Sequence, residues 1–426
     1  MLSARKCFFR TCPPALFCLL LFAACSEMEA PFECTDLLGC VTVGPGEAVK
    51  IGVLQALSGE IAPLGQAQIR GLELALAARE EKISGHPVAL HIEDTGCTAE
   101  GGANAALEII ADPQTLAIFG TTCSGAAATA AKAMSDAGLT MISGNNSAPF
   151  LTSIGGYAAP DWQPGYFRTA GNEENAGKVA AGYVYEQLGL NRAATINDND
   201  IYSKGLTESF KNAFTELGGT IVLDTAINKG DSEMAPVLTA VVNSQAELLF
   251  FPLFQPEGNQ ILLQARQNSA LDEVLLISDG ALIEESFLEA VAEVGKGMCF
   301  VGPAQAGGPA AQELTRAYIA RYEEEPTVRY FLSGYDAADL LLHSIEAAAV
   351  READGTLHIG RKKLRDILYA TRAFKGVTGV LNCDQFGDCA KSSFHVLRLD
   401  DPSLGLRGLE ANVVFPIPLQ TGSLNQ

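Results

Sequence analysis

The sequence predicts an α/β fold with two doubly wound parallel-sheet lobes around a ligand cleft. From Val49 onward, short runs of branched apolar residues alternate with segments of helical spacing. The same alternation restarts after a loop over 155–167 that is rich in Gly, Pro and aromatic residues. Such alternation with short connections builds a parallel sheet covered by helices on both faces. With 426 residues, 48% of them hydrophobic, the chain can form two such sheets, which is more than one domain usually holds.

The first half of the chain supplies the elements of one sheet. Runs of β-branched and apolar residues predict the strands, and apolar residues repeated every three to four positions predict the helices. The strands are expected at 49–54, 88–92, 116–119 and 139–142, and the helices at 64–79, 103–111 and 126–137.

The second half repeats the pattern and then becomes mostly helical. Strands are expected at 193–196, 221–223, 248–251, 274–277 and 298–301, and helices at 176–188, 206–217, 311–322 and 335–350. Residues 376–399 are expected to form a hairpin. Ligands bind at the carboxyl ends of the strands in doubly wound folds, so the informative residues should directly follow strands.

The N-terminus has the pattern of an export signal. Arg5, Lys6 and Arg10 precede an apolar run over 15–24 that is too short to span a bilayer, so 1–24 is predicted to be a signal peptide. The run ends in Leu-Phe-Ala-Ala-Cys, which resembles a bacterial lipobox and predicts lipid on Cys25. Ordinary cleavage after the small residues is the alternative. Residues 25–48 are then expected to be a lipid-anchored tether.

Export changes the interpretation of the cysteines, because disulfides form in oxidising compartments. Two short intervals predict local disulfides, Cys34 with Cys40 and Cys383 with Cys389. Cys97 and Cys123 would then pair, and Cys299 would stay a buried thiol in an apolar strand. Zinc is the weaker alternative, since the spacing is not CxxC and none of the five histidines lies near these cysteines.

Charge and motif content exclude several classes of function. The formal net charge of −21 repels nucleic acid, and no basic or aromatic cluster offsets it. No Ser/His/Asp set and no Gly-x4-Gly-Lys-Ser/Thr phosphate loop is present, so we expect neither an enzyme nor a cofactor or metal.

Four turns that follow predicted strands carry polar residues suited to one ligand. Hydroxyls and helix-end N–H groups after two strands of the first lobe suit a carboxylate. Asp279, after a strand of the second lobe, suits an ammonium group. Facing each other across a cleft, these groups would bind an α-amino acid. The four turns are Thr121–Ser124, 143–147, 197–202 and 278–280.

Each of these residues also has a purely structural interpretation. Ser124 and Ser147 could be helix N-caps, and Asn145 and Asn146 could be turn formers. Asp279-Gly280 is a common turn pair. A calcium loop around Asp198 and Asp200 lacks the glycine and the terminal glutamate of that pattern. The combination of the four turns, rather than any single residue, predicts the ligand.

The sequence resembles the type I periplasmic binding proteins for branched-chain amino acids. The resemblance starts at Lys50-Ile-Gly-Val-Leu-Gln-Ala-Leu-Ser-Gly59, continues through Leu64-Gly65 and Gly71, and covers roughly 49–400. It implies that Cys123-Ser124 grips the substrate carboxylate, with Cys123 disulfide-bonded to Cys97. It also implies that Ser147 and Asn145 hold the head group, that Asp279 completes the ammonium site and that Tyr202 lies in the second-lobe loop.

The sequence departs from the family pattern around the ligand side chain. Leu64 replaces an aromatic residue of some leucine-binding members, Phe254 replaces a tyrosine, and Gly144-Asn145-Asn146 replaces Pro-Ala-Ala. The head-group site is therefore expected to be kept and the side-chain pocket to be altered. The full set of expected ligand residues is Ser124, Asn145, Asn146, Ser147, Tyr202, Phe254, Asp279, Leu64 and Thr122.

The resemblance also implies domain boundaries and a function. Crossovers near Arg168, Cys299 and Ser393 would give one lobe from 49–168 plus 299–392 and another from 169–298 plus 393–426. The protein is expected to be a monomer outside the cytoplasm, lipid-anchored to a bacterial membrane, that captures a branched-chain or similar amino acid between its two lobes and delivers it to the permease of an ABC importer. The alternatives are a ligand-sensing receptor component of the same fold and a binding protein for a non-amino-acid carboxylate or amide.

Overall fold

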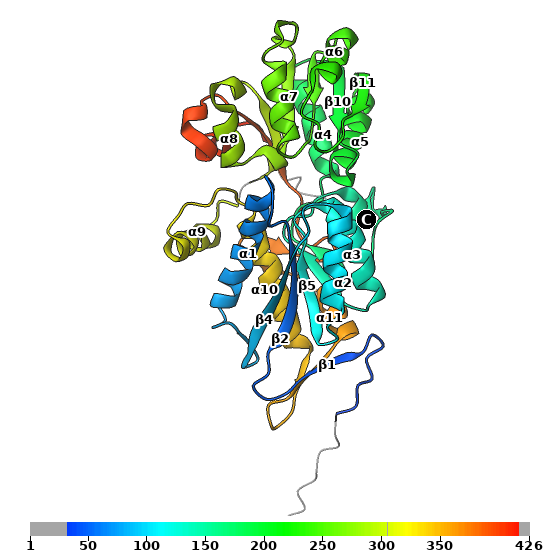
Figure 1. Ribbon diagram of the computed structural model, residues 1–426, viewed down its shortest axis with the longest axis vertical. Coiled ribbons are helices and arrows are strands. Elements are labelled where there is room, and N and C mark those ends of the chain that lie inside the picture. Colours follow the sequence, from blue (N-terminus) through cyan, green and yellow to red (C-terminus); the bar gives the residue numbers. More distant parts are fainter. Residues whose placement is uncertain (1–31, 305, 417–426) are drawn as a thin grey trace, which may run out of the picture. The chain divides into compact units, whose positions relative to one another are not determined.

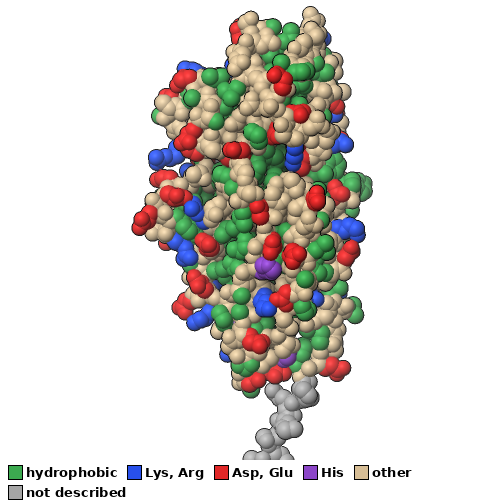
Figure 2. All heavy atoms as spheres, in the orientation of Figure 1, with side chains coloured by type: hydrophobic (Ala, Val, Ile, Leu, Met, Phe, Trp, Pro, Cys, Tyr) green, Lys and Arg blue, Asp and Glu red, His purple; other side chains and the backbone are tan. Residues whose placement is uncertain are grey.

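The computed structural model describes residues 32–304 and 306–416. The predicted signal peptide, Cys25 and the last ten residues of the predicted second lobe lie outside the described residues. In the described part, no helix is long and apolar enough to cross a membrane. Figure 2 shows acidic and basic side chains interspersed over the face in view.

A six-stranded sheet forms the centre of the first lobe. Its order is β3-β4-β2-β5-β6-β9, and every neighbouring pair is parallel except β3 with β4. This central strand β2 with later strands on both sides is the doubly wound order that the sequence predicts. The strands are β2 (Val49–Gln55), β3 (Lys82–Ile83), β4 (His86–Asp94), β5 (Thr115–Gly120), β6 (Thr140–Ser143) and β9 (Tyr166–Arg168).

Helices cover both faces of this sheet (Figure 1). Ile51 and Val53 of β2 pack on the side of α1 (Ala62–Ala77), α10 (Phe331–Ala348) and α11 (Arg361–Tyr369). Leu54 packs on the opposite side with α2 (Ala99–Ile110) and α3 (Ser124–Asp136). Because successive side chains of a strand point to opposite faces, β2 is almost wholly apolar and buried.

A seven-stranded sheet forms the second lobe, in the order β11-β10-β12-β13-β14-β19-β20. The pairs from β11 to β14 are parallel, whereas β19 is antiparallel to β14 and β20. The strands are β10 (Arg192–Asn197), β11 (Thr220–Ala226), β12 (Leu248–Phe250), β13 (Leu275–Asp279), β14 (Cys299–Pro303), β19 (Phe394–Arg398) and β20 (Val413–Pro416).

The second sheet is also covered on both faces (Figure 1). One core contains residues of α4 and α5, and another contains residues of α6, α7, α8 and α12. The helices are α4 (Glu174–Gly182), α5 (Ile201–Glu216), α6 (Ala235–Ser244), α7 (Glu257–Ala265), α8 (Glu285–Val291) and α12 (Gly405–Ala411), and α9 (Pro309–Tyr322) packs on α1.

Three details of the predicted organisation are wrong. Strand β14 belongs to the second sheet, so the crossover predicted near Cys299 follows Pro303 instead. The predicted tether contains β1 (Cys40–Val43), which pairs with β16 (Leu357–Gly360), and β16 also pairs with β15 (Ala349–Arg351). Residues 376–399 do not form one hairpin, because the Cys383–Cys389 loop separates β18 from β19 and β18 (Val380–Leu381) pairs with β17 (Phe374–Lys375).

The predicted disulfides are confirmed. Cys34 bonds Cys40, Cys97 bonds Cys123 and Cys383 bonds Cys389, while Cys299 is a buried free thiol. Two of these bonds secure loops at the ends of strands. The third closes the loop that holds Asp36, whose carboxylate accepts hydrogen bonds from the backbone N–H groups of Lys362 and Lys363 at the start of α11.

Arg168 joins the first crossover to the first lobe. Its side chain is fully buried, and its Nε lies 2.5 Å from Asp388 Oδ1. Its other nitrogens donate to the backbone oxygens of Asn146 and Ala148 and to the Thr152 hydroxyl. The segment from Asn146 to Thr152 that Arg168 contacts is followed by a short hairpin of β7 (Ser153–Ile154) with β8 (Tyr157–Ala158). The crossover therefore starts from a rigid, fully hydrogen-bonded point.

Candidate functional site

Most of the predicted ligand residues meet around one small cavity. Its volume is about 20 Å³, which is room for about one water molecule. Seven of the nine predicted residues line it, and Ala281 and Tyr330 complete the wall. The seven are Leu64, Thr122, Ser124, Asn145, Ser147, Tyr202 and Phe254.

The first-lobe side of the cavity is built on the ends of β2 and β5. Ser124 is the first residue of α3, directly after the Cys97–Cys123 bond, and its Oγ accepts a hydrogen bond from Ala148 N at 3.3 Å. The Thr122 hydroxyl donates to Gln55 and accepts from Ala56 N, so it is already used within the protein. Ser124, at the positive end of a helix dipole, is therefore the group here that suits a ligand carboxylate.

Close backbone packing places Leu64 in the wall. A Cβ at Gly65 would lie 1.9 Å from the carbonyl oxygen of Ala56, so only glycine lets α1 approach this strand end so closely. Leu64 then packs with Tyr202 and Phe254, in one apolar cluster. The two aromatic rings lie 4.9 Å apart between centroids and form the apolar part of the cavity wall with Leu64.

The turn after β6 separates two asparagines that the sequence could not distinguish. Asn145 lines the cavity and donates its amide N–H to the backbone oxygen of Thr122. Asn146, which the sequence predicts to bind ligand, does not line this cavity. Its side chain is fully buried, where its Oδ1 accepts from Thr121 N and from the Tyr166 hydroxyl.

The second-lobe side holds Tyr202 in front of Asp279. Tyr202 lies in the first turn of α5, after the Asp200 N-cap, and its hydroxyl donates to Asp279 Oδ2. Asp279 is fully buried and does not itself line the cavity. Burial raises the pKa of Asp279, and hydrogen bonds from Tyr202 and from backbone offset part of that shift. A ligand cation would therefore reach Asp279 only beside the Tyr202 phenol.

Glu173 is a second buried carboxyl group at this site and was not among the predicted residues. Glu173 lies in the first crossover, and its Oε2 accepts a 2.8 Å hydrogen bond from the Ser147 hydroxyl while its N–H donates to Ser147 O. It forms no ion pair among the described residues. Burial and the charge of Asp279 raise the pKa of Glu173, and Tyr202 is also within hydrogen-bonding reach. It lies five residues after β9, but the sequence placed 155–167 in a loop, so no predicted strand preceded it.

Tyr330 was missed for a similar reason. It precedes α10 rather than following a strand, and its hydroxyl donates a 3.2 Å hydrogen bond to Gly280 O in the other lobe. The phenol packs closely there, since a Cβ at Gly280 would lie 2.7 Å from its oxygen. Tyr330 thus links the two lobes at the site.

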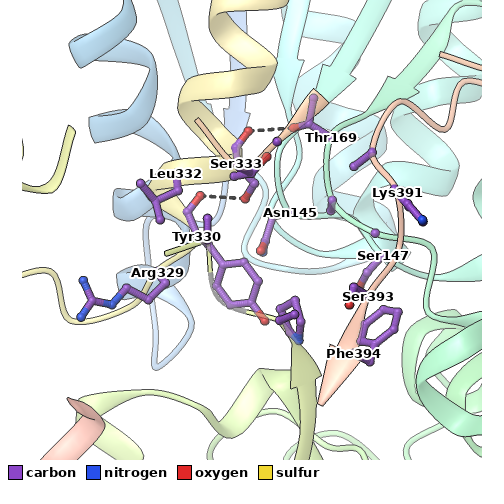
Figure 3. Close-up of a pocket in the computed structure, with 18 of the residues that line it drawn as sticks. Asn145, Ser147, Thr169, Arg329, Tyr330, Leu332, Ser333, Lys391, Ser393 and Phe394 are labelled. Carbon is purple, nitrogen blue, oxygen red and sulfur yellow. Dashed lines mark hydrogen bonds between the residues drawn. The ribbon is translucent and has the colours of Figure 1, made fainter. Parts of the chain in front are cut away.

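A larger cavity, of about 630 Å³, lies on the crossovers between the lobes; we call it the hinge chamber. It shares Asn145, Ser147 and Tyr330 with the small cavity, and Glu173 is also in its wall. Figure 3 shows the rings of Tyr330 and Phe394 facing the same space, with Asn145 and Ser147 between them. The wall also contains Arg329, Glu410 and Lys391, and the imidazole of His395, whose pKa burial lowers.

The described residues contain no group of three or more His, Cys, Asp or Glu side chains that could hold a metal ion. The polar groups around the small cavity are suited to binding a small organic solute. Hydroxyls and a helix terminus come from one lobe, a Tyr–Asp pair comes from the other, and Glu173 joins them at the crossover.

Comparison with known proteins identifies what the chain is similar to. The family model described as "Periplasmic binding protein" matches residues 48–390. Leu/Ile/Val-binding protein homolog 3 of Brucella melitensis is 25% identical over 356 residues, which is 83% of this chain and 92% of that protein.

Solved structures agree with that match. A leucine-binding protein from Thermotoga maritima superposes with a TM-score of 0.73 at 25% identity, over 83% of this chain and 96% of that one. A solute-binding protein of an ABC transporter from R. palustris, in complex with benzoate, gives a TM-score of 0.70 at 21% identity, over 83% and 93% of the two chains. At 21% identity, the similarity to the benzoate-bound protein shows a shared fold only.

Proposed function

The chain belongs to the periplasmic binding protein family, and from this premise we propose that it captures an amino acid between its lobes and presents it to an ABC importer. The observation that carries the proposal is the convergence of both lobes on one cavity. Ser124 and Ser147 come from the first lobe, and Tyr202 backed by Asp279 comes from the second. This set suits one carboxylate and one ammonium group. The relatives named for leucine, isoleucine and valine support the same ligand class.

Capture requires the lobes to move, because the small cavity holds about one water. A ligand shifts an open–closed balance only through its differential affinity for the two states. Groups from both lobes meet the ligand only in the closed state, so ligand favours closure. We propose that the lobes rotate about the segments after Arg168, after Pro303 and before Phe394.

We further propose that the mature protein is a monomer tethered to a bacterial membrane through lipid on Cys25, with 1–24 removed as a signal peptide. The charge pattern of 5–10 and the Leu-Phe-Ala-Ala-Cys run support this. The family places the protein outside the cytoplasm, where disulfides persist.

A thermal-shift screen tests the proposed function. The panel contains the common amino acids, together with short aliphatic acids and amides that lack the amino group. Ligand that binds only the folded state adds RT ln(1 + [L]/Kd) to stability, about 2.7 kcal/mol at a hundredfold excess over Kd. We expect a rise in melting temperature with amino acids and none with the matched acids. A rise with acids or amides alone would move the assignment to a non-amino-acid solute.

A further inference from the structure

The space around the predicted head-group site is distributed unevenly. On the side of Leu64, Tyr202 and Phe254, the protein's own side chains fill it and leave about 20 Å³. On the other side of Asn145, Ser147 and Tyr330, the hinge chamber offers about 630 Å³. Cavities of 300–1,000 Å³ are typical of sites that bury whole drug-sized ligands. The chamber is therefore far larger than a four-carbon side chain requires.

The chamber wall has one carboxyl group available to a cation. Glu410 is paired with Arg329 at 3.2 Å, whereas Glu173 forms no ion pair among the described residues. Glu173 is 3% exposed and is fixed by the Ser147 hydroxyl. A buried carboxylate without a counter-ion is costly, so a ligand ammonium beside it would be favoured.

The rest of the wall suits an apolar, ring-shaped body. Tyr330 and Phe394 direct their rings into the chamber (Figure 3), and Leu332, Leu381 and Ile283 add aliphatic surface. Aromatic rings stack favourably in offset or edge-to-face arrangements, and an ammonium group is attracted to a ring face.

We propose that the hinge chamber holds the body of the solute and that the solute is an ammonium compound with an aromatic body, its nitrogen beside Glu173, Ser147 and the Tyr202–Asp279 pair. This rests on the proposed function and specifies its substrate class. Two sources share this chemistry, an aromatic amino acid and an arylalkylamine. In the first case the carboxylate would reach Ser124, and in the second that contact would not be made.

Calorimetry with the full chain tests the class. The probes are phenylalanine, phenethylamine, leucine and 3-phenylpropionate, which lacks the nitrogen. We expect phenylalanine or phenethylamine to bind at least about tenfold more tightly than leucine, about 1.4 kcal/mol, and 3-phenylpropionate to bind far more weakly. The tighter of the two aromatic probes identifies the source. Leucine binding more tightly than both would overturn the proposal, as would equal binding of 3-phenylpropionate.

A pair of matched variants tests the location. Val380, in the chamber wall, is 55% exposed, and Val350, outside it, is 53% exposed, so tryptophan should be tolerated at both. Val380→Trp should weaken binding of the aromatic probe at least about tenfold, and Val350→Trp should change it less than about twofold. Unchanged binding by Val380→Trp would show that the chamber is not occupied. Failure of every amino-bearing probe would instead refute the proposed function, whereas tight leucine binding that Val380→Trp does not affect would refute only this inference.

Discussion

The phenol of Tyr202 donates a hydrogen bond to the carboxylate of Asp279, although 77 positions separate the two residues in the sequence. The pair is buried at the cleft, and Glu173 lies nearby. Burial raises the pKa of the Tyr202 phenol, and the charges of Asp279 and Glu173 raise it further. The carboxyl groups of Asp279 and Glu173 therefore both lie close to the Tyr202 hydroxyl. No described cation forms an ion pair with either carboxyl group, because the nearby Arg168 is bound to Asp388, and the predictions on ligand binding follow from this.

Asp279→Asn should weaken amino-acid binding more than Ser124→Ala does. Removing one partner of a buried charge pair costs about 2–5 kcal/mol, because the other charge stays desolvated. Loss of one hydrogen bond to a charged group costs about 1.5–3 kcal/mol. Calorimetry with the best amino acid measures both, and the melting temperature of the ligand-free protein is the control. Wild-type affinity in Asp279→Asn would contradict an ammonium site at this residue.

Binding of an ammonium solute should weaken as the pH falls. Burial and the charge of Asp279 raise the pKa of Glu173, and burial raises the pKa of Asp279. Both carboxyl groups therefore become protonated at pH values well above the ordinary carboxyl pKa of about 4. Protonation removes the charge that attracts the ammonium. The groups facing this pair are Tyr202, Tyr330, Ser147 and Arg168, and Arg168 is already bound to Asp388.

Titration between about pH 5.5 and 8.5 in two buffers of different ionisation enthalpy measures this linkage. At pH values below the raised pKa values, the wild-type protein should release protons when it binds an amine, because the bound ammonium favours the ionised carboxylates. Glu173→Gln should bind more weakly and release fewer protons, whereas Glu186→Gln, at an exposed position, should match the wild type. Proton release that is equal in wild type and Glu173→Gln would exclude Glu173 as its source.

Glu284→Gln should stabilise the protein at alkaline pH. Glu284 is buried, its Oε2 accepts from Gln255 Nε2 and Ser286 Oγ, and burial raises its pKa to about 8. A carboxyl group whose pKa is raised in the folded state gives up stability as the pH rises from about 4.5 through about 8, because the unfolded chain loses its proton first. Glutamine accepts the same hydrogen bonds without titrating.

Thermal unfolding at about pH 5 and pH 8 checks this. The melting temperature of Glu284→Gln should exceed that of the wild type by more at pH 8 than at pH 5. Glu289→Gln, at an exposed position of α8, is the control and should show no such trend. A constant difference across the range would mean that Glu284 keeps an ordinary pKa.

Removal of the Cys97–Cys123 bond should cost more stability than removal of the Cys383–Cys389 bond. The first bond joins cysteines 26 positions apart and the second joins cysteines 6 positions apart. A disulfide that closes a longer loop lowers the entropy of the unfolded chain more. The double substitution Cys97→Ala with Cys123→Ala should lower the free energy of unfolding by about 3–4 kcal/mol. Denaturant titration of the two double variants compares them. An equal loss in both would argue against loop entropy as the cause.

Replacing Cys25 with Ser should release the protein from the membrane. A lipobox cysteine carries the lipid, and serine cannot be lipidated there, so the variant should move to the soluble fraction. Fractionation of cells that express each form measures this. Membrane association retained by Cys25→Ser would exclude the lipid anchor, and Cys34→Ser, which lies after the predicted cleavage site, is the cysteine control.

The sequence predicted the parts of the site that follow strands, and it failed elsewhere for geometric reasons. Ser124, Ser147 and Tyr202 each lie four or five residues beyond the end of a strand that the sequence predicts, where parallel sheets present ligands. Glu173 lies five residues beyond β9, but this strand falls where the sequence predicted a loop, and Tyr330 precedes a helix, so neither had a predicted strand before it.

The sequence also could not distinguish two neighbouring residues of one turn. Asn145 and Asn146 have the same side chain, and the dihedral angles of the turn decide which one faces the cavity. Similarly, β14 reads as an ordinary buried strand, and its membership of the second sheet is decided by its pairing with β13 on one side and with β19 on the other. Local pattern carries no information about such long-range pairing.

The contacts of Asp36 with the start of α11, and the pairing of β1 with β16, fix the chain from Cys34 onward to the first lobe. Tension applied through the preceding residues is therefore transmitted to the first lobe and not to the second. In a membrane-tethered protein, the first lobe would carry the attachment, and each opening and closing cycle would move the second lobe relative to the attached one. A permease would then meet an attached lobe and a second lobe whose position depends on occupancy.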